Sequence, residues 1–141
     1  MTVQFTVPGD PFGKQRPRLS QYGTAYTPAK TRAYEQKMRD SYLESSSSHI
    51  YRKLNGPIRL TVEAYFAIPK STDRNDRLRM ESGLIRPTKK PDLDNVIKTI
   101  DGLNGFAFDD DVQIVEIRAT KLYTNSIHPA PCVTITLEEL K

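Results

Sequence analysis

Apolar and polar residues alternate along several segments of the chain, which is the pattern of strands that bury one face. Residues 2–8 place Val3, Phe5 and Val7 on one side. The clearest such run covers residues 56–69, and its alternating apolar residues are Ile58, Leu60, Val62, Ala64 and Phe66. We therefore predict strands over both segments.

Two further strands are predicted near the end of the chain. Residues 112–124 form a long run in which Ile117 lies on one face, and the other face carries Val112, Ile114 and Glu116. Residues 130–140 form the last strand, and its inward residues are Val133, Ile135 and Leu137.

A four-residue period predicts a helix over residues 27–45, with Tyr34, Met38 and Tyr42 on one face. Thr27 is its expected N-cap and Pro28 its first helical residue. The serines that follow, up to His49, are expected to form a flexible connector.

A second helix is predicted over residues 93–105, capped by Asp92 or Asp94 and ended by Gly105. Residues 9–23 are rich in Gly, Pro and cations and are expected to form a loop. Residues 70–90 are polar and basic, and the sequence leaves a mobile loop and a short helix equally open.

The order of these elements is β-α-β-α-β-β, and no internal repeat or break divides residues 1–141. We predict a single α+β domain, with a mostly antiparallel or mixed β-sheet and helices on one face. A chain of 141 residues suits one domain with one modest core.

Charge is unevenly distributed along the chain, although the formal net charge is only +4. Residues 10–39 carry seven Lys and Arg against two acids, and residues 70–91 carry seven against three. Residues 92–141 reverse this balance, with nine acids against four bases. Two basic stretches around an acidic centre suit a protein that holds phosphates and places a metal ion among them.

The remaining bulk features indicate a cytoplasmic protein. Cys132 is the single cysteine, so no internal disulfide can form, and its apolar surroundings predict a buried thiol. The N-terminal sequence MTVQFTV is not a signal peptide, and no window is apolar enough for a membrane span.

The acidic centre, KPDLDNVIKTIDGLNGFAFDDDVQ, is the segment that most clearly carries chemistry. Its six aspartates are Asp92, Asp94, Asp101, Asp109, Asp110 and Asp111. Crowded carboxylates repel one another unless water or a cation neutralises them. Carboxylate oxygens are ligands for Mg²⁺ or Mn²⁺. The two histidines, His49 and His128, lie outside this segment, so we expect no zinc site.

The helix would place Asp94, Lys98 and Asp101 on one face, and the run of three aspartates could return close to the helix start. Each of these residues could also have a purely structural role. Asp94 could only cap the helix, Lys98 could only pair with Asp94, and the aspartate run could be a solvated turn. Neither a phosphate-binding P-loop nor an EF-hand pattern is present.

The segment KPDLDNVIKTIDGLNG followed by DDDVQIVEIRATK resembles the RusA family of Holliday junction resolvases, which prophages often carry. The family pattern is Asp-x-Asp-Asn-x-x-Lys, then a carboxylate pair before a Gln-containing strand, then a later lysine. Here these positions are Asp92, Asp94, Asn95, Lys98, Asp110, Asp111, Gln113 and Lys121. GKQRPR, residues 13–18, resembles a Lys-x-Arg-Pro-Arg stretch of the family.

The resemblance implies a homodimeric, Mg²⁺-dependent endonuclease, with Mn²⁺ as a possible substitute, that cuts four-way DNA junctions by paired symmetric nicks. It implies that Asp92, Asp94 and Asp111 bind the metal, with Asp110 as the neighbour that could replace Asp111. It makes Lys98 the essential lysine.

Phosphate contacts are expected from the basic stretches and the later lysine, namely Lys14, Arg16, Arg18, Lys89, Lys90 and Lys121. Tyr22 and Tyr26 could stack on exposed bases or belong to the core. Two other hypotheses stay open from the sequence: a catalytically inactive branched-DNA-binding protein of the same fold, and a structural or regulatory domain whose acids are only solvated.

Overall fold

A computed structural model describes residues 1–45 and 53–141 of the chain. In chain order its elements are β1 (Thr2–Pro8), β2 (Arg18–Leu19), β3 (Ala25–Tyr26), α1 (Ala29–Ser45), β4 (Ile58–Phe66), α2 (Arg74–Glu81), α3 (Leu93–Ile97), the 3-10 helices η1 (Lys98–Leu103) and η2 (Asp111–Gln113), β5 (Ile114–Tyr123) and β6 (Cys132–Glu139). The connector predicted after Ser45, with His49, lies outside the described residues. None of the described helices is long and apolar enough to cross a membrane.

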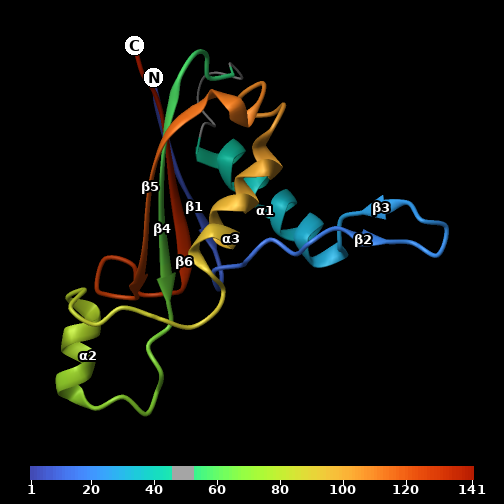
Figure 1. Ribbon diagram of the computed structural model, residues 1–141. Coiled ribbons are helices and arrows are strands. Elements are labelled where there is room, and N and C mark those ends of the chain that lie inside the picture. The colour runs from blue at the N-terminus through green and yellow to red at the C-terminus, as the bar shows by residue number, and fades with distance from the viewer. Residues whose placement is uncertain (46–52) are drawn as a thin grey trace.

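Four of the strands form one mixed sheet in the order β1-β6-β4-β5 (Figure 1). β6 lies antiparallel between β1 and β4, whereas β5 runs parallel to β4. Parallel neighbours need a crossover connection, and here the crossover contains α2, α3, η1 and η2. The prediction of an α+β fold with a mostly antiparallel or mixed sheet is confirmed.

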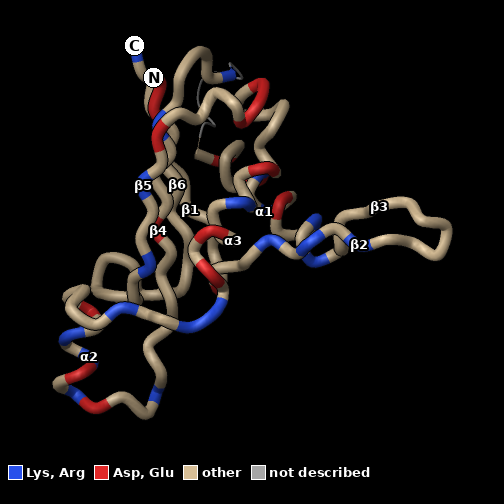
Figure 2. Tube along the Cα trace, in the orientation of Figure 1, with Lys and Arg blue, Asp and Glu red and all other residues tan. Residues whose placement is uncertain are grey.

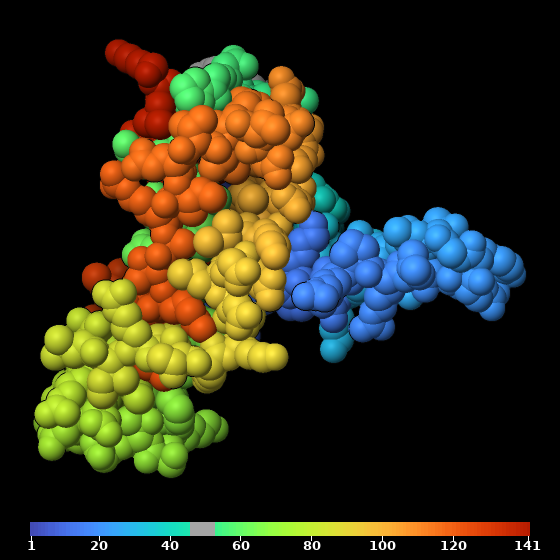
Figure 3. Space-filling model, in the orientation of Figure 1, coloured from blue at the N-terminus to red at the C-terminus, as the bar shows by residue number. Residues whose placement is uncertain are grey.

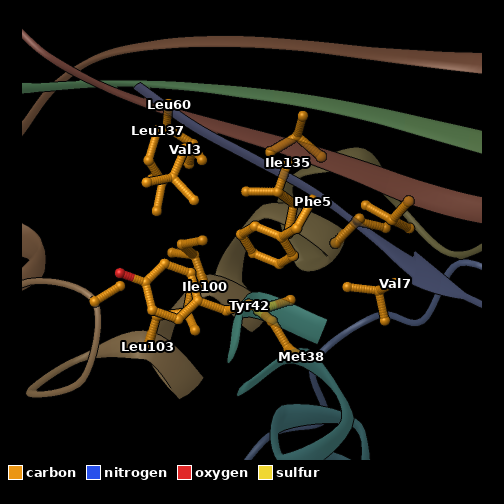
Figure 4. Packing of buried hydrophobic residues seen from close by; sticks show 14 of the residues in the cluster. Val3, Phe5, Val7, Met38, Tyr42, Leu60, Ile100, Leu103, Ile135 and Leu137 are labelled. Atoms are coloured by element: carbon orange, nitrogen blue, oxygen red, sulfur yellow. The ribbon is translucent and has the colours of Figure 1, made fainter. Parts of the chain in front are cut away.

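The core lies between one face of the sheet and the helices α1, α3 and η1 (Figures 1 and 4). Strand side chains such as Phe5 and Ile135 point toward Met38 and Tyr42 of α1 and toward Leu103 of η1. The alternation predicted for β1, β4 and β6 is confirmed, because the inward residues of all three strands are buried. The tyrosine-methionine face of α1 is buried as predicted, and Cys132 is buried.

The segment left open at residues 70–90 contains a short helix, α2. Asp73 caps this helix by accepting a hydrogen bond from the backbone N–H of Asp76 at 2.8 Å. None of the residues of α2 is buried, and the helix lies beyond one end of the sheet rather than on its face (Figure 1). The core-forming helices are therefore α1 and the α3–η1 pair.

The prediction for the faces of β5 is wrong at its start. Val112 belongs to η2 rather than to the strand, and a β-bulge between the Ile114 and Glu116 pairs shifts the register. Ile114 therefore pairs with Ile58 on the buried side, whereas Glu116 pairs with Arg59 on the opposite side. A single extra residue in one strand reverses the faces of everything beyond it.

Residues 9–23 are not entirely a loop as predicted. Their second half enters the small hairpin β2–β3, which projects from the body of the molecule (Figures 1 and 3). The helix predicted over residues 93–105 begins after Asp92 but changes from α3 to the 3-10 helix η1 at Lys98. At this transition the Thr99 hydroxyl donates a 2.6 Å hydrogen bond to the Val96 carbonyl, three residues earlier in the chain.

Candidate metal and DNA site

The loop after β1 packs directly against the start of α3. The backbone N–H of Lys14 donates to the Asn95 carbonyl at 2.9 Å. A Cβ on Gly13 would lie 2.8 Å from the Cβ of Pro91 and 3.3 Å from that of Asn95, so only glycine allows this approach. Phe12 anchors the loop on its other side by stacking on Tyr34 of α1, with ring centroids 5.1 Å apart.

A cleft of about 440 Å³ opens between this loop and the helix. It is lined by Lys14, Gln15, Arg16, Pro17, Asp92, Asp94, Asn95, Lys98 and Asp101. Three of the six aspartates of the acidic centre and Lys98 therefore face one cleft together with two cations of the loop. The prediction that Asp94, Lys98 and Asp101 share a side is confirmed, and the 3-10 geometry of η1 keeps Lys98 and Asp101 aligned three residues apart.

Asp92 occupies the N-cap position of α3, but its side chain makes no capping hydrogen bond. Its extended backbone, with φ −65° and ψ 144°, directs the chain into the helix, and its carboxylate is left available to another partner. Of the two caps predicted for this helix, Asp92 is the one at the correct position. It also borders a second cleft, formed with Phe12, Gly13 and Lys90.

Asp94 and Lys98 form a loose pair at the mouth of the cleft. The Lys98 Nζ lies 3.9 Å from the Asp94 Oδ2, and the two side chains are 59% and 71% exposed. Such an exposed pair contributes little to stability, about 0.3–0.5 kcal/mol. Both groups are therefore easily redirected toward a ligand.

Asp101 lies deeper and connects the cleft to the aspartate run. Its Oδ2 is 2.9 Å from the Lys14 Nζ, and that ammonium is also 3.7 Å from the Glu35 Oε2 of α1. A hydrogen bond with Asp110, then partial desolvation and the contact with Asp101, raise the pKa of Asp111 above its ordinary value. Carboxyl groups of η1 and of the aspartate run thus come into contact, but at Asp101 rather than at the helix start, where the sequence placed the run.

Gln113 holds the aspartate run in place. Its side-chain Oε1 accepts hydrogen bonds from the backbone N–H groups of Asp109 at 3.0 Å and Asp110 at 3.2 Å. Its Nε2 donates to the carbonyls of Leu54 and Gly56. Asp110 is the N-cap of η2 and accepts from the Val112 N–H at 3.2 Å, so its carboxylate has a structural partner.

Lys121 lies at the other end of β5, next to the segment that leads into Asp92. Its Nζ donates to the carbonyls of Pro91, at 3.0 Å, and of Lys89. The same ammonium lies 5.0 Å from the centre of the Phe66 ring. The side chains of Lys89 and Lys90, by contrast, form no ion pair with a described residue, and Figure 2 shows this basic segment directly before the acidic start of α3.

The β2–β3 hairpin extends the wall of the cleft outward, because Arg16 and Pro17 line the cleft and Arg18 begins β2 (Figure 3). Tyr22, at the hairpin tip, is 84% exposed, and Tyr26 is 46% exposed, which excludes the core role considered for both. Arg16 and Arg18 make no side-chain ion pair within the described part of the chain.

The donor set fits a hard divalent cation such as Mg²⁺. Asp92 and Asp94 present carboxylate oxygens to one cleft, and Mg²⁺ is usually bound by one or two carboxylates with water and phosphate at its other positions. Over residues 1–45 and 53–141, no three His, Cys, Asp or Glu side chains converge closely enough to form a complete metal cage. Asp111 touches Asp101 but does not line the cleft of Asp92 and Asp94.

The sequence assigned no role to two residues that the structure brings to this site. Asp101 was placed on the correct helix face but received no role, although its spacing from Asp94 was a usable signal. Glu35 gave no signal, because it reaches Lys14 only through the packing of α1 against η1. A Cβ on Gly102 would lie 2.7 Å from the Glu35 Cβ, so this packing also depends on a glycine.

Comparison with known proteins places the chain in a family. The family model described as Endodeoxyribonuclease RusA matches residues 8–138, which is nearly the whole chain. The chain is also similar to the uncharacterized protein YqaN of Bacillus subtilis (strain 168), with 33% identity over 144 residues that cover 98% of this chain and 96% of the relative. The match includes the loop after β1, the α3–η1 segment and the aspartate run before β5. The chain therefore belongs to the RusA family of endodeoxyribonucleases.

Proposed function

We propose that this nuclease is an Mg²⁺-dependent enzyme that resolves four-way DNA junctions by paired symmetric nicks. The observation that carries the proposal is the shared cleft of Asp92, Asp94 and Lys98, in which the Asp92 carboxylate is free of the capping bond its position would allow. A metal-dependent nuclease needs carboxylates that can bind a cation, and a carboxylate without a hydrogen bond to the protein is available for this.

Asp92, Asp94 and Asp111 are the proposed metal ligands. Asp110 is less suited than Asp111, because the Asp110 carboxylate already caps η2. The crowding that raises the pKa of Asp111 is what a divalent cation would relieve. When bound, such an ion activates water and stabilises charge on the phosphate.

Lys98 is proposed to act on the reacting phosphate. It is one helical turn from Asp94, which lies 3.9 Å away, and more than half of its side chain is open to solvent. Its ammonium can therefore swing from Asp94 to a phosphate oxygen and stabilise the charge that develops there. Removal of its charge would lower the rate more than the affinity for DNA.

The DNA backbone is proposed to lie across the cleft. Arg16 and Arg18 flank it on the hairpin side, and Lys89 and Lys90 flank it beside α3. These four side chains make no ion pair with a described residue, so no internal contact must be broken for them to reach phosphates. Tyr22 and Tyr26 on the projecting hairpin are exposed and available to stack on unpaired bases.

A homodimer is part of the proposal, because a four-way junction is nearly two-fold symmetric and paired cuts need two coupled sites. The edge strand β5 supports self-association. Val115 and Ile117 on this strand are 63% and 50% exposed, and an exposed edge strand with apolar side chains can pair with another chain.

The test is cleavage of a synthetic four-way junction with Mg²⁺, scored on a denaturing gel. Paired symmetric nicks are expected for the natural protein, and Asp92→Asn and Lys98→Ala should reduce them by at least about 100-fold. Asp109→Asn is the matched control, because Asp109 pairs with Lys53 at 3.1 Å away from the cleft, and it should cut normally.

One observation favours the inactive alternative, a branched-DNA-binding protein of the same fold. The described acids do not form a complete metal cage without further movement. Tight junction binding with no cut in Mg²⁺ or Mn²⁺ would establish that alternative and exclude the enzyme.

A further inference from the structure

Lys121 occupies a position where a lysine is unusual. It pairs in register with Ala64, which is fully buried, so its side chain leaves β5 on the helix-covered face of the sheet. The sheet places it beside the chain segment that enters α3. Its three N–H donors must find acceptors there.

Two of those acceptors are backbone carbonyls rather than acids. The Nζ donates to the Pro91 carbonyl at 3.0 Å and to the Lys89 carbonyl, and it lies over the Phe66 ring at 5.0 Å. Lys121 has no ion pair with any residue in the described part of the chain. Charge-assisted bonds of this kind are stronger than neutral ones, so the ammonium clamps the backbone at two points just before Asp92.

The direction of the Asp92 carboxylate depends on that backbone. The side chain makes no capping bond of its own that would orient it. Its flanks are held by Lys121 on the Pro91 carbonyl, by Gly13 against the Pro91 ring, and by the bond from the Lys14 N–H to Asn95. Loss of the lysine would leave two carbonyls without their charged donor and release this segment on the β5 side.

We propose that Lys121 is a positioning residue for the Asp92–Asp94 metal ligands, not a phosphate contact as its place in the sequence led us to expect. The inference rests on the proposed function, because it assumes that these carboxylates bind a divalent cation. Partners of metal ligands commonly change metal affinity by 10- to 100-fold when they are removed.

Lys90 provides a matched control from the same segment. It is a lysine two residues before Asp92, and its side chain forms no ion pair with a described residue. If Lys121 positions the metal ligands and Lys90 contacts phosphate, Lys121→Ala should lose metal affinity and Lys90→Ala should lose DNA affinity.

The experiment compares natural protein, Lys121→Ala, Lys121→Arg, Lys121→Gln and Lys90→Ala in two measurements. The first is Mn²⁺ binding without DNA, by isothermal titration calorimetry. The second is junction affinity in EDTA as a function of salt. Lys121→Ala should weaken Mn²⁺ binding about 10-fold and leave junction affinity and its salt dependence unchanged. Lys121→Arg, which keeps the charge and the donors, should recover part of the Mn²⁺ affinity.

Lys90→Ala should do the reverse, keeping Mn²⁺ affinity but lowering the salt slope of junction binding by about one. The proposal is overturned if Lys121→Ala behaves like Lys90→Ala. It is also overturned if Mn²⁺ binds the natural protein and Lys121→Ala equally well, an outcome that leaves the proposed function intact. Natural protein that binds no Mn²⁺ would overturn both. If Lys121→Ala does not fold, Lys121→Gln and Lys121→Arg decide the same question.

Discussion

The Lys14 ammonium lies 2.9 Å from the Asp101 carboxylate and 3.7 Å from that of Glu35, so one side chain of the loop after β1 holds both α1 and η1. Partial burial lowers the Lys14 pKa, but the hydrogen bond to Asp101 and the charges of both acids outweigh it and raise the pKa. Lys14 is therefore occupied within the fold, and its expected contact with phosphate remains a prediction.

Coupling between Lys14 and Asp101 can be measured with a double-mutant cycle. Lys14→Met should destabilise the protein by about 1 kcal/mol, because it leaves two partly buried acids without their cation. Asp101→Asn alone should have a smaller effect, and the coupling energy should be about 0.5–1 kcal/mol. Chemical denaturation of the four proteins measures it. Additive effects would mean that the pair does not hold the loop.

Asp111→Asn should stabilise the metal-free protein while it abolishes cleavage. The raised pKa of Asp111 means that the folded state prefers the protonated carboxyl. This preference stabilises the fold below the pKa of the unfolded chain and is lost as pH rises through the folded pKa, so at neutral pH the charged side chain opposes folding. Removing the charge should raise the melting temperature by about 1–3 °C at pH 7.

The same gain should disappear near pH 3, where the carboxyl of the natural protein is protonated as well. Asp109→Asn is the control, because Asp109 loses a pair with Lys53 and should show no gain at either pH. Thermal scans at both pH values make the comparison. Equal shifts for the two variants would argue against crowding at Asp111.

Gly13→Ala should separate the loop from α3. The new Cβ would lie 2.8 Å from the Pro91 Cβ, a distance that forces one segment to move. Overpacking of this kind destabilises by about 1–3 kcal/mol, and the displaced Pro91 should also weaken Mn²⁺ binding. Gly23→Ala in the hairpin is the control, since its φ of +78° adds strain but its Cβ would meet nothing within 4 Å. Unchanged Mn²⁺ affinity in Gly13→Ala would show that the loop does not support the metal ligands.

Alkaline pH should destabilise the fold through Tyr65. Burial, then the charge of Glu63 and the hydrogen bond to it, raise the pKa of Tyr65 to about 12. A folded pKa above the unfolded value of about 10 stabilises the protein below pH 10, and this contribution is lost as pH rises to about 12. Denaturation at several pH values should show a decline that is shallower in Tyr65→Phe. An identical decline in both proteins would mean that Tyr65 ionises as freely when folded as when unfolded.

Elements with a regular pattern were predictable from the sequence. The strand over residues 2–8 and the buried face of α1 depend on local periodicity, which the chain carries in its own order of residues. The same holds for the start of α3, because Asp92 comes directly before a helical pattern. The motif residues Asp92, Asp94 and Lys98 could be named because they lie within two helical turns of one another.

Local pattern failed where distant segments set the geometry. The register shift in β5 arises from pairing with β4, and neither strand reveals it alone. The 3-10 turn of η1 packs against Glu35 of α1 through Gly102, which is 67 residues away in sequence (102 − 35). The hairpin β2–β3 has only two residues per strand, too short for alternation to be visible.

The sequence by itself determined which charged groups this protein brings to its candidate site, because six aspartates and a lysine supply carboxylate oxygens and a cation wherever they lie in space. Only the tertiary structure decided how these groups are used. In the structure the Asp110 carboxylate caps η2, whereas the Asp92 carboxylate makes no capping bond. Lys14 pairs with the Asp101 carboxylate and Lys121 donates to the Pro91 carbonyl, and both partners are distant along the chain. The interaction of a charged side chain depends on its distance from a partner. That distance is set by the packing of segments that are far apart in sequence, so the sequence alone does not show it.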